Sequence, residues 1–121
     1  MSRRELVVLG TASMVPTRTR NHNGYVLLWD DEAILFDPGE GTQRQMTFAG
    51  VSANALTRIG LPQLPGAPSL GLAGVSQRIS GDGVRHTIGV TYPASGQRWV
   101  NHLLDASAHY RRGHLDLQPV T

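Results

Sequence analysis

The segment Asp37-Pro38-Gly39-Glu40-Gly41-Thr42 carries the residue types best suited to chemistry in this sequence. It follows an apolar run over residues 33–36, so it places carboxylates at the end of a predicted strand and glycines at the start of a predicted helix. Free backbone amides at such a helix start can receive an anion. The segment lacks the Gly-Lys-Ser/Thr ending of a nucleoside-triphosphate loop and the three spaced glycines of a dinucleotide-binding turn. From local preferences alone, Asp37 and Glu40 are better interpreted as helix-capping residues than as catalytic ones.

The histidines make a weaker case for a metal site. They are His22, His86, His102, His109 and His114, and none forms a tight cluster with a carboxylate at ligand spacing. His102 and His109 lie seven residues apart on one face of a predicted helix, so a three-histidine site with His114 requires the helix end to fold back. Exposed imidazoles are the simpler interpretation, because a zinc site needs matched geometry and supporting hydrogen bonds. No Gly-x-Ser-x-Gly elbow is present, which argues against a serine hydrolase.

Composition bounds the class of protein. The 121 residues, 40% hydrophobic and 17% charged, suit one folded domain. No apolar run reaches the ~20 residues that span a bilayer, and no signal-peptide core follows the first residues, so we expect a cytoplasmic protein without membrane contact. The absence of cysteine excludes disulfides and thiolate metal sites. The eleven basic residues are all arginine, at a net charge of +2. This permits an RNA partner but equally fits ordinary solvated arginines.

The elements that must position the Asp37 segment follow from hydrophobic patterning. The predicted strands cover residues 5–9, 25–29, 33–36, 56–61, 86–92 and 115–120. The predicted helices cover 38–49 (capped by Asp37 and ended by Gly50), 69–79 (capped by Ser69) and 97–111. Residues 11–24 form a long irregular loop that carries Arg18, Arg20 and Asn21. Strands that pair locally and then alternate with helices predict an α/β fold with a mixed sheet and flanking helices.

Two features of the C-terminal region carry further expectations. Trp99, Leu103, Ala106 and Tyr110 recur at helical spacing, and we expect Trp99, Leu103 and Tyr110 to face the core. A sequence that stops directly after a strand is typical of a truncated domain, and we expect the last strand to form a sheet edge without its neighbour.

Four segments then match a known family in order. They are Leu9-Gly10-Thr11-Ala12 with Pro16 and Arg20-Asn21, Phe36 to Gln45, Ser69 to Gly74, and Tyr92-Pro93-Ala94-Ser95-Gly96. Together they resemble the N-terminal part of ribonuclease Z, the tRNA 3′-processing endonuclease of the metallo-β-lactamase superfamily. The resemblance implies that residues 1–121 are the N-terminal half of an αββα sandwich, truncated. It also implies precursor tRNA rather than DNA as the partner, two zinc ions as the cofactor, and commonly a homodimer.

The same resemblance implies roles for particular residues. Asp37 would lie beneath the metal loop, and Gly39, Gly41 and Thr42 would shape the adjoining turn. Glu40, Arg20 and Asn21 would either support the residues of the site from behind or lie near the substrate. Arg44 would contact a phosphate or serve a structural role, although an exposed arginine on a helix surface is the simpler interpretation.

The metal loop of this sequence departs from the family pattern. The family carries His-x-His-x-Asp-His where this chain has Gln63-Leu64-Pro65-Gly66-Ala67-Pro68. Gln63, Pro65 and Pro68 therefore occupy the histidine positions, and Ala67 occupies the position of the aspartate proposed as general base. Proline and alanine side chains have no donor atom and a glutamine amide is a poor zinc ligand, so this loop cannot build the site. The other family ligands lie beyond the stretch that this chain matches.

Three interpretations follow for function. The chain represents a zinc-dependent ribonuclease Z whose metal loop is altered by damage to the sequence. Alternatively, it is an inactive remnant that binds tRNA through Arg18, Arg20 and Arg44, or that pairs its sheet edge with a full-length subunit. The third is a fragment without a stable fold. In each case the resemblance predicts no catalysis by this chain alone, because no metal would activate water.

Overall fold

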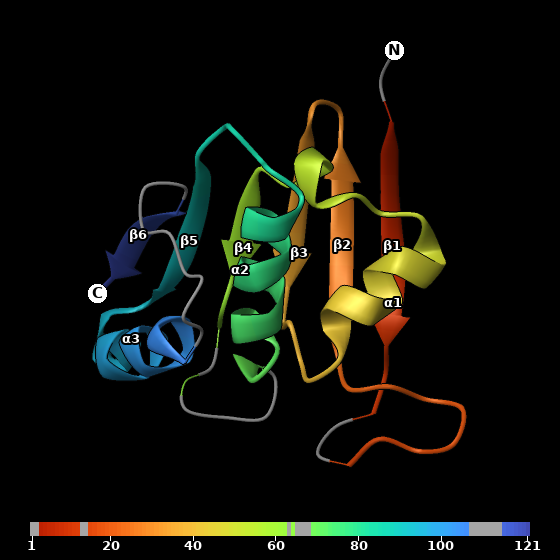
Figure 1. Ribbon diagram of the computed structural model, residues 1–121, viewed down its shortest axis with the longest axis horizontal. Coiled ribbons are helices and arrows are strands. Elements are labelled where there is room, and N and C mark those ends of the chain that lie inside the picture. The colour runs from red at the N-terminus through yellow and green to blue at the C-terminus, as the bar shows by residue number, and fades with distance from the viewer. Residues whose placement is uncertain (1–2, 13–14, 63, 65–68, 107–114) are drawn as a thin grey trace.

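Six strands form one sheet whose order follows the sequence from β1 to β6 (Figure 1). The computed structural model describes residues 3–12, 15–62, 64, 69–106 and 115–121. The strands are β1 Arg4–Gly10, β2 Gly24–Trp29, β3 Glu32–Phe36, β4 Arg58–Gly60, β5 Ile88–Pro93 and β6 Leu115–Val120. The helices are α1 Thr42–Ala49, α2 Leu72–Gly81 and α3 Gln97–Asp105, with short 3-10 turns η1 Ala53–Ala55 and η3 Ala94–Gly96.

The sheet is mixed, as the sequence predicts. β1, β2 and β3 pair antiparallel, and β3, β4, β5 and β6 pair parallel. Parallel neighbours need crossover connections, and α1, α2 and α3 supply them. β6 forms one edge of the sheet, next to β5 (Figure 1). The expected mixed α/β sheet with flanking helices is therefore confirmed.

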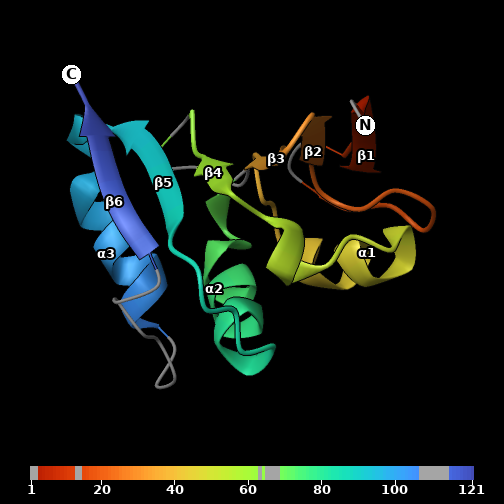
Figure 2. The ribbon, with the colours of Figure 1, turned by 90° about the horizontal axis from the view of Figure 1, so that it is seen from above.

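One face of the sheet carries the core. α1 and α2 lie on the same side of the sheet, and α3 lies at its β5–β6 end (Figure 2). Strand residues on the helix-covered side are almost fully buried, and they include Val26, Leu35, Ile59, Val90 and Tyr92. We call this side the helix face and the other side the open face. The alternation along each strand therefore divides buried from more accessible side chains.

Three predicted element boundaries are corrected. α1 begins at Thr42 rather than Pro38, its N-cap is Gly41, and no side chain caps it, so Asp37 and Glu40 are not helix caps. α2 begins at Leu72 after Gly71 and likewise has no side-chain cap, so Ser69 does not cap it. β4 is three residues long rather than six. At the starts of α1 and α2, a turn that ends in glycine occupies residues that local preference assigned to the helix.

Among the described residues, the predicted core stripe of α3 is confirmed only for Leu103. Val100 and Leu104 are its buried residues, whereas Trp99 is 40% exposed. Leu103 is partly buried against the core, Ala106 is exposed, and Tyr110 lies outside the described residues. Two apolar rows run along this helix, one with Trp99 and Leu103 and one with Val100 and Leu104. Packing buries the row with Val100 and Leu104. No helix within the described ranges is long and apolar enough to cross a membrane.

Candidate functional site

The segment between β3 and α1, residues 37–42, folds as a tight turn that we call the acidic turn. Its backbone enters the left-handed region at Asp37, with φ 52°, and at Gly41, with φ 81°. Asp is one of the few residues other than glycine that tolerate this region. The Asp37 amide donates to the Gly60 carbonyl at 3.2 Å, which ties the turn to the end of β4. The acidic turn therefore begins where two parallel strands end, at the edge of the sheet where α/β sites form.

The loop before β2 wraps around the acidic turn. The Asn21 side-chain amide donates to the Glu40 carbonyl at 2.8 Å, and the Gly39 amide donates to the Asn23 carbonyl at 2.9 Å. A Cβ at Gly39 would lie 2.5 Å from the Cβ of His22, closer than atoms can approach. Glycine at this position is therefore required by the close contact. Asn21 holds the turn, and its predicted position near the substrate or among the residues that support the site stays a prediction.

The start of α2 packs against the same turn. The Gly71 amide donates to the Pro38 carbonyl at 2.7 Å. A Cβ at Gly71 would lie 1.9 Å from the Gly39 carbonyl oxygen. The end of β1 approaches from another side, because a Cβ at Gly10 would lie 1.8 Å from the His22 carbonyl oxygen. The acidic turn is thus the point where β1, the loop before β2, α1 and α2 meet.

Buried polar groups surround the turn. Thr42 is 1% exposed, and within the described part of the chain its hydroxyl has no hydrogen-bond partner; the same holds for Oδ1 of Asn23. His22 is buried, with its Nδ1 3.9 Å from a carboxylate oxygen of Glu40. Burial raises the pKa of the Asp37 carboxyl above its ordinary value. A buried polar group without a partner costs free energy, and such a cluster is typical of a functional position in a fold.

Comparison with known proteins decides the relationship. No family model matches the sequence. The chain is 59% identical over 120 residues to the protein named "Ribonuclease Z" of Nocardia farcinica, covering 99% of this chain and 39% of that protein. The "Ribonuclease Z" of Streptomyces coelicolor is 64% identical over 109 residues, covering 90% of this chain and 36% of the relative. Over the matched residues the chain is similar to these ribonuclease Z proteins.

Solved structures agree with this relationship. Human tRNase Z, short form, superposes with a TM-score of 0.80 at 28% identity, over 94% of this chain and 43% of the human chain. A metallo-β-lactamase fold protein from Bacillus subtilis superposes with a TM-score of 0.73 at 19% identity, over 96% of this chain and 46% of that chain. The expected metallo-β-lactamase fold is confirmed. The ribonuclease Z-like chain spans about two-fifths of the length of the curated relatives it matches.

The remaining predicted residues lie around the acidic turn on the surface of the ribonuclease Z-like chain. Arg44 is exposed on α1, and its guanidinium lies 5.1 Å from the centre of the Phe48 ring. Arg18 and Arg20 are exposed on the loop before β2. Arg20 closes a small turn of that loop, since its amide donates to the Thr17 hydroxyl at 2.9 Å. The buried Thr42 packs under Gly24.

Two residues that support the site were not predicted from the sequence. The Gln45 side chain donates to the Leu9 carbonyl at 3.0 Å and joins α1 to β1. Arg78 joins α2 to α1, donating to the Thr47 hydroxyl at 2.8 Å and the Gln43 carbonyl at 3.2 Å. Gln45 belongs to the Phe36 to Gln45 motif, so the motif could have pointed to it. Arg78 has no sequence signal, because its partners lie 31 and 35 residues away.

The metal loop of the ribonuclease Z-like chain is only partly described. The predicted ligand positions Gln63, Pro65, Ala67 and Pro68 lie outside the described residues. Between them Leu64 packs close to Gly96, where an added Cβ would lie 2.7 Å from the Cβ of Leu64. Leu64, which follows β4 in the chain, therefore lies beside Gly96 at the start of α3.

The residues at the metal-loop positions do not fit the zinc ions that the family implies. Within the described ranges, no group of three or more His, Cys, Asp or Glu side chains could hold a metal ion. The loop itself supplies proline, alanine and glutamine, which do not make a zinc donor set. His102 of the alternative three-histidine site is exposed on α3, and His109 and His114 lie outside the described residues.

Proposed function

We propose that this chain descends from zinc-dependent endonucleases that cleave precursor tRNA at its 3′ end, and that it retains tRNA binding without cleavage. The observation that carries the proposal is the side-chain chemistry at the metal loop. Gln63, Pro65, Ala67 and Pro68 stand where the family places three histidines and an aspartate. Without those donors no zinc ion is held to activate water or to stabilise the leaving oxygen.

The acidic turn supports retention of the scaffold. Asn21, Gly39 and Gly71 all make close contacts with it or within it. These contacts require glycine at positions 39 and 71 and an amide side chain at position 21, and this chain keeps all three residues. We infer that the part of the family scaffold present here remains formed around an altered metal loop.

Binding of tRNA is assigned to arginines beside the acidic turn. Arg18, Arg20 and Arg44 are exposed there. A guanidinium can bind phosphate through two parallel hydrogen bonds, which makes arginine well suited to a tRNA backbone. Binding through phosphates weakens as salt increases, because bound counterions are released. We therefore expect weak, salt-dependent binding of precursor tRNA.

The experiment measures binding and cleavage together. Fluorescence anisotropy with labelled precursor tRNA follows binding at several salt concentrations, and gel analysis with added zinc follows cleavage. The triple variant Arg18→Gln/Arg20→Gln/Arg44→Gln should weaken binding about tenfold and lower the salt dependence by about two to three counterions.

A matched control removes the same charge elsewhere. Arg3, Arg4 and Arg85 are exposed at the opposite end of the sheet. The variant Arg3→Gln/Arg4→Gln/Arg85→Gln should bind nearly as the unmodified chain does. Equal weakening by both triple variants would overturn the assigned tRNA surface. Zinc-dependent cleavage by the unmodified chain would overturn the loss of catalysis and favour the competing interpretation, an active nuclease.

A further inference from the structure

α3 carries an exposed tryptophan on its outer side. Val100 and Leu104 of this helix belong to the core on the helix face, and α3 packs beside α2 (Figure 2). Trp99 is 40% exposed, and its neighbours Arg98 and His102 are exposed as well. We call these three residues the Trp99 surface. In an αββα sandwich the helices form the outer layers, so this surface is separate from the open face, against which a second sheet packs.

Two basic side chains contact the Trp99 ring. The Arg98 guanidinium lies over the ring, 5.7 Å from its centre. The His102 ring meets it edge to face, with 6.0 Å between the ring centres and 82° between the ring planes. A cation over an aromatic face is attracted by the electrons of the ring. The Trp99 surface therefore holds a large aromatic ring and a positive charge next to each other in contact with solvent.

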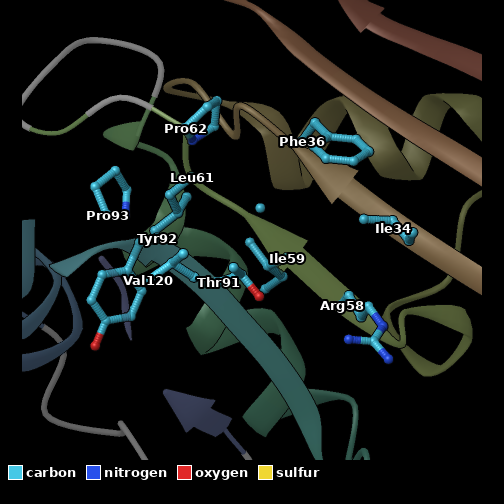
Figure 3. Close-up of a pocket in the computed structure, with 11 residues that line it drawn as sticks. Ile34, Phe36, Arg58, Ile59, Leu61, Pro62, Thr91, Tyr92, Pro93 and Val120 are labelled. Carbon is cyan, nitrogen blue, oxygen red and sulfur yellow. The ribbon is translucent and has the colours of Figure 1, made fainter. Parts of the chain in front are cut away.

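The Trp99 surface follows the turn that contacts the metal loop. Leu64 of that loop lies beside Gly96, where α3 starts. Pro62, just before the loop, and Pro93, at the end of β5, line one hollow of about 500 Å³ on the sheet (Figure 3). On the other side, the acidic turn donates an amide hydrogen bond to the Gly60 carbonyl. The segment that leads into the metal loop therefore connects the acidic turn to the start of α3.

An aromatic ring beside a guanidinium suits an unpaired nucleotide. Unpaired bases stack on aromatic side chains, whereas the bases of a double helix already stack on one another and are not accessible. The guanidinium can bind the phosphate of the same strand. The acidic residue Asp105 lies about two turns from Arg98, at the far end of α3. The charge beside the ring is therefore positive, as an RNA strand requires.

We propose that the Trp99 surface binds an unpaired nucleotide of RNA, with the base stacked on Trp99 and the phosphate held by Arg98. This inference rests on the proposed function, the retention of tRNA binding. It adds a second contact on the opposite side of the metal loop from Arg20 and Arg44. The recognised segment is single-stranded, and stacking accepts any base, so recognition does not depend on sequence.

Tryptophan fluorescence tests the contact directly, because the chain has two tryptophans. In Trp29→Phe the emission comes from Trp99 alone, and a single-stranded RNA of about 12 nucleotides should quench it as a base stacks on the ring. Trp99→Phe is the matched control, because it leaves Trp29, which also lies beside an arginine: the Arg4 guanidinium is 4.3 Å from its ring centre. The emission of Trp29 should not change. A blunt-ended RNA hairpin should quench neither variant.

Fluorescence anisotropy with the same single strand measures the affinity. Trp99→Ala should weaken binding about tenfold, and Trp99→Phe should keep most of the affinity because it keeps an aromatic face. Arg98→Gln should lower the salt dependence by about one counterion. Far-UV circular dichroism verifies that each variant keeps the fold.

Unchanged Trp99 emission, or equal affinity of Trp99→Ala and the unmodified chain, would overturn this inference. If Arg18→Gln/Arg20→Gln/Arg44→Gln still weakens binding in that case, the proposed function stands without it. If neither variant weakens binding, both are overturned. A change in the sedimentation of Trp99→Ala without RNA would show that the surface pairs two chains, and it would also overturn the inference.

Discussion

The Gly71 amide donates to the Pro38 carbonyl at 2.7 Å, so the start of α2 rests directly on the acidic turn. This contact connects the start of α2 to the turn that precedes α1. In the sequence, the metal loop lies between these two helices. The loop before β2 holds the same turn through Asn21. The acidic turn therefore organises the local fold, whatever side chains the adjacent loop carries.

Gly71→Ala should lower the free energy of unfolding by about 2–4 kcal/mol, because the new Cβ would meet the Gly39 carbonyl oxygen. Gly71 has φ −79° and ψ −5°, a conformation open to alanine, so the clash alone is tested. Gly81→Ala is the control, since no atom lies within 4 Å of its added Cβ. It should be neutral or slightly stabilising. Urea unfolding measures both, and equal stability of the two variants would refute the close packing at Gly71.

Asn21→Ala removes the hydrogen bond from Asn21 to the Glu40 carbonyl and should cost about 1 kcal/mol. Asn54→Ala, at an exposed position of η1, should change stability by less than ~0.5 kcal/mol. Thermal unfolding of both variants measures the difference. No loss in Asn21→Ala relative to Asn54→Ala would contradict the role assigned to Asn21.

Arg78→Ala should destabilise the fold by about 1–2 kcal/mol, because Arg78 donates across the helix pair to Thr47 and Gln43. Arg78→Lys keeps the charge but not the planar group of donors, so it should recover less than half of the loss. Both substitutions preserve helix propensity, so the loss reports the contacts of Arg78, which also include its ion pair with Asp82 at 2.9 Å. Full stability of Arg78→Lys would show that charge alone suffices.

The Asp37 carboxyl predicts a specific pH dependence. Burial raises its pKa in the folded state above the ordinary value of 3.8. The folded state therefore holds its proton to higher pH than the unfolded state does, and stability falls as pH rises from 3.8 through the folded pKa. Asp37→Asn removes the ionisation, and asparagine tolerates the same left-handed backbone.

The difference in stability between Asp37→Asn and the unmodified chain should grow in favour of the variant from acid to neutral pH. Urea unfolding across this pH range measures it. A difference that stays constant with pH would mean that burial does not perturb this carboxyl.

Regular elements of the fold could be predicted from the sequence because their apolar periods are strong. Residues 115–120 form β6 as predicted, and the strands before and after the Asp30 hairpin match closely. The start of α1 could not be predicted, since Asp37-Pro38 has the local signature of a helix cap. Contacts with Asn23 and Gly60 hold those residues in a turn instead. Tertiary contacts outweighed the local preference.

The site could be predicted in part. Its motif located the acidic turn, but the support from Gln45 and Arg78 depends on partners distant in the sequence. Trp99 was placed in the core because it belongs to an apolar row at helical spacing. The neighbouring row, with Val100 and Leu104, has the same period, and only packing against the sheet and α2 distinguishes them.

Zinc binding by the unmodified chain tests the central claim most directly. A variant restores the family ligands at the four loop positions: Gln63→His, Pro65→His, Ala67→Asp and Pro68→His. Equilibrium dialysis at micromolar zinc compares the two chains. The account predicts no stoichiometric zinc in the unmodified chain and about one ion in the restored one. Tight binding of one or two zinc ions by the unmodified chain would contradict it.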